Sequence, residues 1–175
     1  MNGDKPIRGI KFDGSGAGRG SAENPRRKPR ILFVCTANAA RSQMAEGLLR
    51  AKYGDRYEAF SAGTRQSKVS TRAIRVMQEI GIDISSHRSK TIADVSGVGF
   101  DCTVTLCDNA HAACPVVPGA KKTIHRGFAD PHQVPGTEEE VLAGYRAVRD
   151  EIAAWIDETF SPSGPHNKID DLPSQ

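Results

Sequence analysis

Apolar residues in the middle of the chain fall into short runs that alternate with segments of helical period. The run ILFVC at 31–35 is continuous and β-prone, which is typical of a central strand buried on both faces of a sheet. Three further runs have the composition of strands: 57–61, 101–107 and 122–125. We therefore predict four strands.

Three segments between and after these runs carry apolar residues at helical spacing. The first covers 42–53, and the second begins at its cap Ser70 and ends at Gly81, with Ile80 on its apolar face. The third is a long helix over 138–160. This order of elements predicts an α/β fold with a four-stranded, doubly wound parallel sheet and helices on both faces. The active edge of such a sheet lies at the carboxyl ends of its strands.

Both ends of the chain differ from the middle in composition and charge. Of the 175 residues, 1–30 include eight basic and three acidic ones, whereas 31–160 include 15 basic and 16 acidic ones. Both flanks are poor in apolar residues, so folding cannot offset the entropy of ordering them. We expect a disordered basic tail at 1–29, one catalytic domain at 30–160 and a disordered tail at 161–175.

Charge and hydropathy also bear on partners and location. The net charge of +3 belongs to the N-terminal flank, so the nearly neutral middle gives no electrostatic reason to expect nucleic acid. No apolar run is long enough for a membrane span or a signal peptide. We expect a cytoplasmic protein with no membrane partner.

The segment CTANAARS follows the first predicted strand and leads into the first predicted helix. Such a turn directs backbone N–H groups and the helix dipole at an anion. Arg41 supplies a planar fork for two oxygens of a tetrahedral oxyanion, and the same positive field favours the thiolate of Cys35. Ser42 is placed to donate a hydrogen bond to that sulfur. The expected substrate-binding residues are Thr36, Ala37, Asn38, Ala39, Ala40 and Arg41.

This combination of nucleophile and anion clamp suits attack by Cys35 on a phosphorus or arsenic centre. A cysteine followed by five residues and an arginine also occurs by chance, and an isolated strand cysteine is more often simply buried. The predicted strand before Cys35 and the predicted helix after it favour the catalytic interpretation.

The stretch ILFVCTANAARSQMAEGLLR resembles the opening of the low-molecular-weight protein tyrosine phosphatase superfamily. Within it, RSQMAEG is more similar to the thioredoxin-coupled arsenate reductases than to the phosphatases. The likeness continues through FSAG at 60–63 and FADP at 128–131, and it covers 30–160. It implies a flavodoxin-like fold, arsenate as substrate, arsenite as product and thioredoxin as reductant, with another thiol partner left open.

Further cysteines bear on the choice between a reductase and a phosphatase. Hydrolysis of a phosphate ester needs one cysteine, whereas reduction of arsenate needs two electrons, which a dithiol supplies when it becomes a disulfide. The resemblance implies that Cys35 attacks arsenate, Cys107 attacks Cys35, and Cys114 attacks Cys107. Cys102 is expected to be core packing. The alternatives are an ordinary strand-end role for Cys107 and a zinc site formed by Cys107, His111 and Cys114. Because these three ligands have no fourth nearby, we predict no metal, and we predict no cofactor either.

Asp130 precedes a proline and is the candidate general acid for the departing oxygen, with a plain Asp-Pro turn as the alternative. In phosphatases of the superfamily, aromatic residues that flank the substrate ring typically follow the Asp-Pro. This chain has His132 and Gln133 there, and the facing stretch 64–70 has no aromatic residue. A small oxyanion is therefore favoured, and low-molecular-weight phosphatase activity is the alternative function. Three histidines are expected to be structural or solvated: His87, His125 and His132.

Three positions depart from the family pattern. Ala37 stands where glycine or histidine is usual, which matters if that residue needs a positive φ. Ala39 stands where serine is frequent, and removes a hydroxyl. Some relatives bind potassium beside the loop, and Lys90 occupies a position that matches one of the ligands. Our hypothesis is that the Lys90 ammonium takes the place of the cation against Glu46 and holds Asn38 still.

Overall fold

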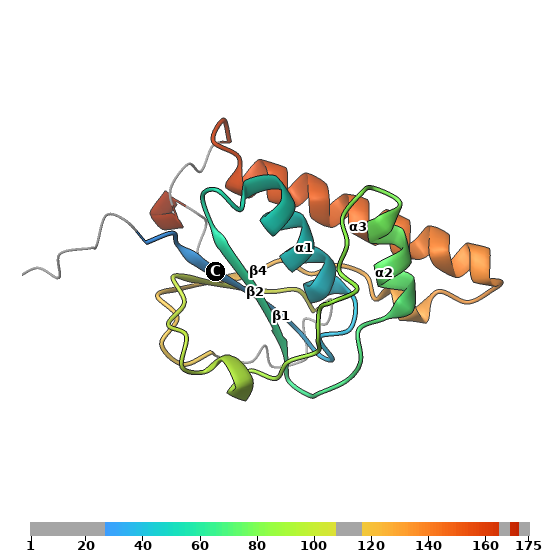
Figure 1. Cartoon of the computed structure of the whole chain (residues 1–175), viewed down its shortest axis with the longest axis horizontal. Helices are drawn as coiled ribbons and strands as arrows, with labels where there is room; N and C mark the ends of the chain where they lie inside the picture. The colour runs from blue at the N-terminus through green and yellow to red at the C-terminus, as the bar shows by residue number, and fades with distance from the viewer. Residues whose placement is uncertain (1–26, 108–116, 165–168, 172–175) are drawn as a thin grey trace, which may run out of the picture.

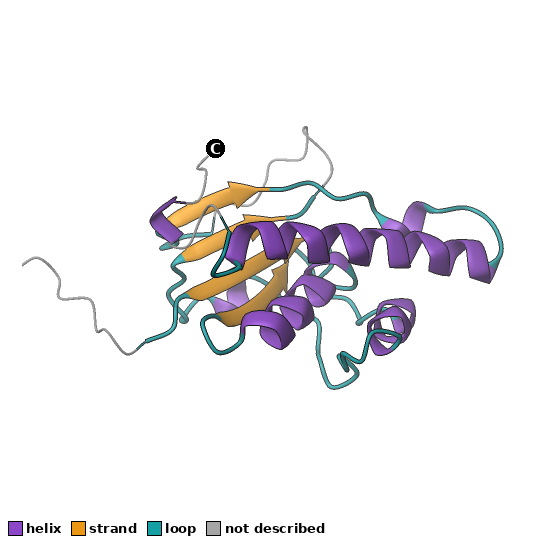
Figure 2. Cartoon of the chain, turned by 90° about the horizontal axis from the view of Figure 1, so that it is seen from above, coloured by secondary structure: helices purple, strands orange, loops and turns teal. Residues whose placement is uncertain are grey.

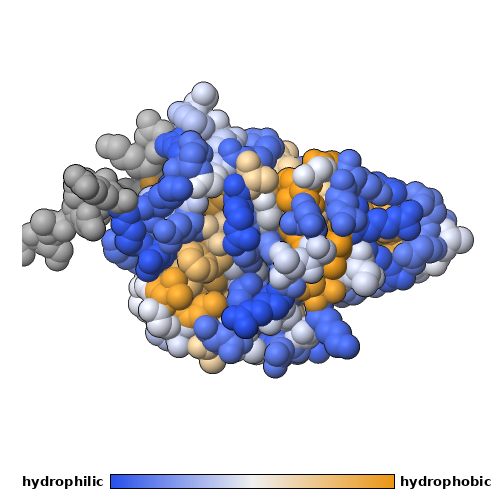
Figure 3. Space-filling model, in the orientation of Figure 1, coloured by the Kyte–Doolittle hydropathy of each residue, from blue (hydrophilic) through white to orange (hydrophobic). Residues whose placement is uncertain are grey.

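The structure is a computed structural model that describes residues 27–107, 117–164 and 169–171 (Figure 1). Most of the expected N-terminal tail lies outside the described residues, as do Cys114 and His111. In the described part of the chain, no helix has both the length and the apolar character needed to cross a membrane. Figure 3 shows hydrophilic residues over most of one face, with apolar residues confined to a few areas.

Four parallel strands form one sheet in the order β2-β1-β3-β4. Their bounds are β1 Arg30–Cys35, β2 Glu58–Gly63, β3 Cys102–Thr105 and β4 Lys122–His125. Phe33 of β1 lies opposite Ser61 of β2 on one side and Val104 of β3 on the other. Because β1 is central, five of its six residues are buried. The predicted four-stranded parallel sheet is confirmed.

Three α-helices follow the strands in the predicted order: α1 Arg41–Tyr53, α2 Thr71–Gln78 and α3 Glu138–Phe160. Ser70 caps α2, because its hydroxyl accepts a hydrogen bond from the backbone N–H of Ala73. A capping box formed by Thr137 and Glu140 begins α3. Local sequence therefore sets where these two helices start.

The second helix ends earlier than the sequence predicts. After Gln78, the backbone N–H of Ile80 bonds to the carbonyl of Met77 (3.1 Å), and the N–H of Ile82 bonds to the same carbonyl (3.0 Å). Gly81 adopts a φ of 77°, which turns the chain away from the helix axis. The prediction that Ile80 lies on the buried face was wrong, since this residue is 44% exposed.

The α-helices cover one face of the sheet and enclose the main core (Figure 2). The opposite face carries a smaller apolar cluster made of Leu32, Val34, Ala62, Val95, Phe100 and Val117. A short 3-10 helix, η1 (Ala93–Val95), contributes to this second cluster. Helices therefore lie on both faces, although within the described residues the α-helices lie on one face alone.

The residues just before β1 contact the domain. Arg27 donates to both carboxylate oxygens of Asp101 (2.9 and 2.8 Å), and the Lys28 ammonium donates to the carbonyl of Gly54 (2.7 Å). Asp101 also accepts the backbone N–H of Arg30 (2.9 Å). These contacts attach Arg27 and Lys28, which belong to the predicted basic tail, to the fold.

A short segment after α3 is also ordered. The 3-10 helix η3 (Ile169–Asp171) packs Ile169 against the main core, and the Lys122 ammonium donates to the Ile169 carbonyl (3.2 Å). The predicted tail at 161–175 thus includes a segment that contacts the core through an apolar side chain, while 165–168 and 172–175 lie outside the described residues.

Candidate active site

The loop 36–40 connects the end of β1 to the start of α1, at the carboxyl edge of the sheet. Asn38 has a φ of 46°, and it is the one non-glycine residue with a positive φ in the part of the chain that the structure describes. Asparagine adopts this left-handed conformation more readily than alanine. Because the positive φ lies at Asn38, Ala37 causes no backbone strain.

The thiol of Cys35 lies at the base of this loop and is almost fully buried. The Sγ atom of Cys35 is 2.9 Å from the Oγ atom of Ser42, and the same Oγ accepts a hydrogen bond from Asn38 Nδ2 (2.8 Å). Because the Ser42 hydroxyl accepts from Asn38, its single proton is available to the sulfur. The predicted contact between Cys35 and Ser42 is present, and the Ser42 hydroxyl can donate to the sulfur in it.

Strand β2 ends beside the loop at Gly63, whose role the sequence did not reveal. A Cβ atom at this position would lie 2.8 Å from the backbone nitrogen of Asn38 and 2.9 Å from the carbonyl oxygen of Thr36. That carbonyl also accepts the backbone N–H of Arg65 (3.1 Å). Glycine therefore lets the loop lie directly against the end of β2.

Polar groups of α1 and of residues 89–90 form hydrogen bonds to the loop. Gln43 Nε2 donates to the carbonyl (3.1 Å) and the side-chain oxygen (2.9 Å) of Asn38. The backbone N–H of Lys90 donates to the same side-chain oxygen (2.7 Å), and Ser89 Oγ donates to the carbonyl of Ala37 (3.1 Å). The sequence did not single out Gln43 or Ser89. For Gln43, the available signal was a polar residue on the face of the predicted helix that packs against the fold.

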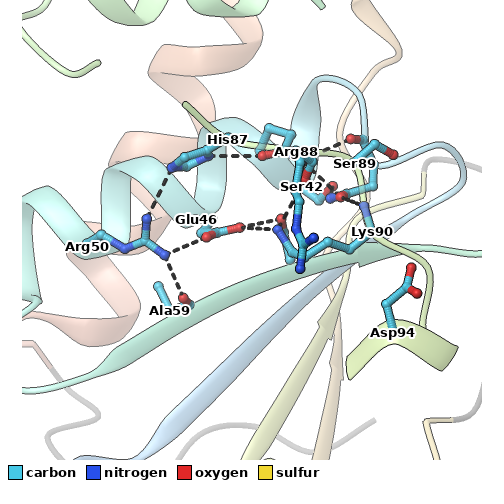
Figure 4. Close-up of polar contacts among 12 residues, drawn as sticks. Ser42, Glu46, Arg50, Ala59, His87, Arg88, Ser89, Lys90 and Asp94 are labelled. Carbon is cyan, nitrogen blue, oxygen red and sulfur yellow. Dashed lines mark hydrogen bonds and ion pairs between the residues drawn. The ribbon is translucent and has the colours of Figure 1, made fainter. Parts of the chain in front are cut away.

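Glu46 of α1 is buried and lies at the centre of a cluster of charged side chains next to these contacts (Figure 4). Its Oε1 atom bonds to Arg50 Nη2 (2.5 Å), and its Oε2 atom accepts the Ser61 hydroxyl. The Lys90 ammonium lies 3.4 Å from Oε2. Lys90 thus contacts Glu46 through its side chain and Asn38 through its backbone, which is the arrangement that our hypothesis for Lys90 requires.

His87 lies beside Arg50 (Figure 4) and connects this cluster with Gln43. Its Nε2 atom lies 3.1 Å from Arg50 Nη1, and its Nδ1 atom lies 3.0 Å from Gln43 Oε1. Burial lowers the pKa of His87; Glu46 opposes this effect, while Arg50 and Lys90 add to it. A neutral imidazole that accepts at Nε2 and donates at Nδ1 satisfies both contacts, which supports the structural role expected for His87.

Arg41, at the end of loop 36–40, contacts Asp130. The Arg41 guanidinium is buried, donates to the carbonyl of Phe128 (3.0 Å) through Nη1, and lies 3.4 Å from Asp130 Oδ2 through Nη2. Asp130 caps the 3-10 helix η2 (Pro131–Gln133), and its side chain is 23% exposed. The structure therefore brings the candidate general acid next to the candidate anion clamp.

The described cysteines occupy two different environments. Cys107 is buried just beyond β3, with its Sγ atom 3.8 Å from the Thr36 hydroxyl, so a second thiol lies against the loop that holds Cys35. Cys102 is fully buried within β3, and burial raises its pKa to about 12. That environment fits the predicted packing role of Cys102. The described residues contain no cluster of three or more His, Cys, Asp or Glu side chains that could hold a metal ion.

Comparisons with known proteins agree with this geometry. Residues 30–160 match the family model for low molecular weight phosphotyrosine protein phosphatase. The chain is 45% identical over 134 residues to the arsenate reductase of Halalkalibacterium halodurans, over 77% of this chain and 96% of that protein.

Two solved structures extend the comparison. An arsenate reductase in the phosphate binding state superimposes with a TM-score of 0.61 at 27% identity, over 74% of this chain and 94% of the other. The thioredoxin-dependent arsenate reductase of Corynebacterium glutamicum superimposes with a TM-score of 0.53 at 25% identity, over 76% of this chain and 64% of the other.

The sheet order, the strand-to-helix loop and the match over residues 30–160 therefore lead to one assignment. The chain belongs to the low molecular weight phosphotyrosine protein phosphatase family.

Proposed function

We propose that this protein reduces arsenate to arsenite. Loop 36–40 and Arg41 bind the oxyanion, and Cys35 is the nucleophile. The observation that carries the proposal is the position of Cys107, a second thiol 3.8 Å from Thr36 of the loop, because reduction needs a dithiol and hydrolysis does not. The 45% identity to an arsenate reductase supports the same choice of substrate.

The proposed reaction begins at arsenic. The Cys35 thiolate forms a bond to arsenic, and one arsenate hydroxyl leaves as water with a proton from Asp130. The Cys107 thiolate then attacks the Cys35 sulfur and forms a disulfide. The sulfur–arsenic bond breaks, its electron pair stays on arsenic, and arsenite is released.

The relay ends at Cys114, which lies outside the described residues. Its thiolate attacks Cys107, which frees Cys35 and leaves a Cys107–Cys114 disulfide. A reduced thioredoxin returns this disulfide to two thiols by exchange. Such a cycle needs reduced cysteines, so we place the protein in the cytoplasm; neither a membrane nor nucleic acid takes part.

A coupled assay tests this proposal. The oxidation of NADPH is followed with arsenate, thioredoxin and thioredoxin reductase for the wild type and for the Cys35→Ser, Cys107→Ser and Cys114→Ser variants. All three variants should lose the coupled activity, while Cys102→Ser, the buried control, should keep it. Full activity of Cys107→Ser or Cys114→Ser would contradict the relay.

Hydrolysis of phosphate monoesters is the second candidate function, because the matching family is named for phosphotyrosine phosphatases. The stretch 64–70, which we expect to face the substrate, has no aromatic residue to stack on a phenyl ring. With 4-nitrophenyl phosphate as substrate, a phosphatase would need Cys35 and tolerate serine at both Cys107 and Cys114. That pattern, without activity towards arsenate, would favour hydrolysis.

A further inference from the structure

His132 contacts the carboxyl group of Asp130 at one oxygen. The backbone N–H and the Nδ1 atom of His132 lie 3.2 and 3.3 Å from Asp130 Oδ1. The other oxygen, Oδ2, lies 3.4 Å from Arg41 Nη2. The two oxygens of this carboxyl group therefore have different partners, the histidine on one side and the anion clamp on the other.

The imidazole ring of His132 also rests on the framework of the site. It stands edge-on against the ring of Tyr145, with centroids 5.5 Å apart and an interplanar angle of 63°. Tyr145 is fully buried in α3, and its hydroxyl lies 3.0 Å from Ser70 Oγ. The backbone N–H of Ser70 donates to the carbonyl of Ala39 (2.8 Å) in loop 36–40, the proposed anion loop. The ring is thus held between Asp130 and residues that support the loop.

The direction of the side-chain hydrogen bond follows from the chemistry of the two groups. Asp130 Oδ1 already accepts the backbone N–H of His132, and in the proposed acid the proton sits on Oδ2. Oδ1 then only accepts hydrogen bonds in both states of the carboxyl group, so His132 Nδ1 donates to it. Both the imidazolium and the Nδ1–H neutral tautomer provide this hydrogen. The contact therefore does not depend on one charge state of the histidine.

We infer that His132 is a positioning residue for the proposed general acid. Two N–H donors on Oδ1 prevent the carboxyl group from rotating and exchanging its two oxygens. Oδ2 is therefore the oxygen that carries the proton and faces the oxygen that leaves arsenate. The inference rests on the proposed role of Asp130, and it gives His132 a function beyond the structural or solvated role that the sequence predicts.

Two substitutions at His132 distinguish the effect of its hydrogen-bond donor from the effect of its ring contact with Tyr145. His132→Asn keeps an N–H donor at the place of Nδ1 but removes the ring, whereas His132→Phe keeps the ring edge against Tyr145 but removes the donor. Gln133→Ala, at the exposed neighbouring residue, is the control. The His132 side chain is 46% exposed, and urea unfolding of each variant verifies that folding is unchanged.

The full-length reduced protein is used in excess over arsenate, and arsenite is quantified after rapid quenching. This single-turnover design leaves thioredoxin out of the measurement, and the dependence of rate on protein concentration separates binding from chemistry. His132→Phe should lower the maximal rate constant by about 2- to 12-fold, the equivalent of one hydrogen bond, with unchanged half-saturation. His132→Asn and Gln133→Ala should react like the wild type.

Asp130→Asn completes the design. Its own loss should be about 10²- to 10⁴-fold, as for a general acid, and His132→Phe should cause no further loss in the Asp130→Asn background. A wild-type rate for His132→Phe, an equal loss in His132→Asn, or a further loss in the double variant would overturn the inference. A wild-type rate for Asp130→Asn would instead show that the acid role of Asp130 itself is wrong.

Discussion

Lys90 supports the anion loop through two separate groups. Its backbone N–H holds the side chain of Asn38 (2.7 Å), and its ammonium lies 3.4 Å from the Glu46 carboxylate. The Glu46 side chain is 6% exposed, and a carboxylate buried to this degree needs cationic partners. Arg50 is one partner and Lys90 is the other, so we propose that this chain carries its own cation beside the loop.

Potassium should therefore have no effect on the activity. The wild type should reduce arsenate at the same rate in potassium chloride and in sodium chloride of equal ionic strength. Lys90→Met leaves Glu46 with Arg50 as its one cationic partner among the described residues, so the rate of this variant should fall and should rise when potassium is added. The coupled assay measures both rates, with Lys68→Met at an exposed lysine as the control. Strong potassium activation of the wild type would refute the role of Lys90.

At the scale of elements, the site depends on how closely β2 and the anion loop approach each other. Gly63 ends β2, and its missing side chain leaves room for the backbone of Thr36 and Asn38. The loop in turn fixes Ser42 at the first turn of α1, where its hydroxyl contacts Cys35 (2.9 Å). A strand end, a loop and a helix start therefore form one unit.

Gly63→Ala should damage this unit. The added Cβ would lie 2.8 Å from the Asn38 nitrogen, and a displacement of backbone of this kind costs about 1–3 kcal/mol. We expect a lower free energy of unfolding in urea together with a lower single-turnover rate. Gly97→Ala is the matched control, since a Cβ there has no atom within 4 Å. Equal stability and equal rates of the two variants would disprove the role of Gly63.

Over the whole molecule, the N-terminal segment is tied to the sheet through Asp101. Burial by itself would raise the pKa of Asp101, but the backbone N–H of Arg30, the Lys121 ammonium and the charge of Arg27 together hold it below its ordinary value. A carboxyl group with a lowered pKa stabilises the fold above its unfolded-state value, and this contribution is lost as the pH falls through the folded-state value.

Asp101→Asn should therefore destabilise the protein in a pH-dependent way. At neutral pH we expect the free energy of unfolding to fall by about 1.5–3 kcal/mol, the contribution of a hydrogen bond to a charged group. Below about pH 4, where the carboxyl group is protonated in the unfolded chain, the difference from the wild type should shrink. Urea unfolding at several pH values measures this difference. A difference in the free energy of unfolding that stays constant down to acidic pH would contradict this role of Asp101.

Periodicity and turn chemistry predicted most of this architecture. The four strands, the order of the helices and the cap at Ser70 follow from local patterns that the tertiary structure keeps. The end of α2 did not follow from these patterns. Gly81 with its positive φ and two hydrogen bonds to the Met77 carbonyl end the helix before Ile80. The docking of Arg27 was missed as well, since its partner Asp101 is 74 residues away.

The candidate site was predictable where neighbouring residues form it. Cys35, Ser42 and Arg41 lie within one strand-to-helix connection, so their spacing carries the information. Gly63 and Ser89 reach the loop from distant segments, and their types alone gave no signal. Contacts of this kind depend on the packing of the whole domain.

In the proposed reaction, each arsenate oxidises two particular thiols of this protein. In a single turnover without external reductant, the full-length protein should lose two free thiols for each arsenite released. Peptide mapping should find them as a Cys107–Cys114 disulfide, with Cys35 and Cys102 still reduced, and Cys114→Ser should accumulate a Cys35–Cys107 disulfide instead. Formation of arsenite with Cys107 still reduced, or no loss of thiols with arsenate, would contradict the account.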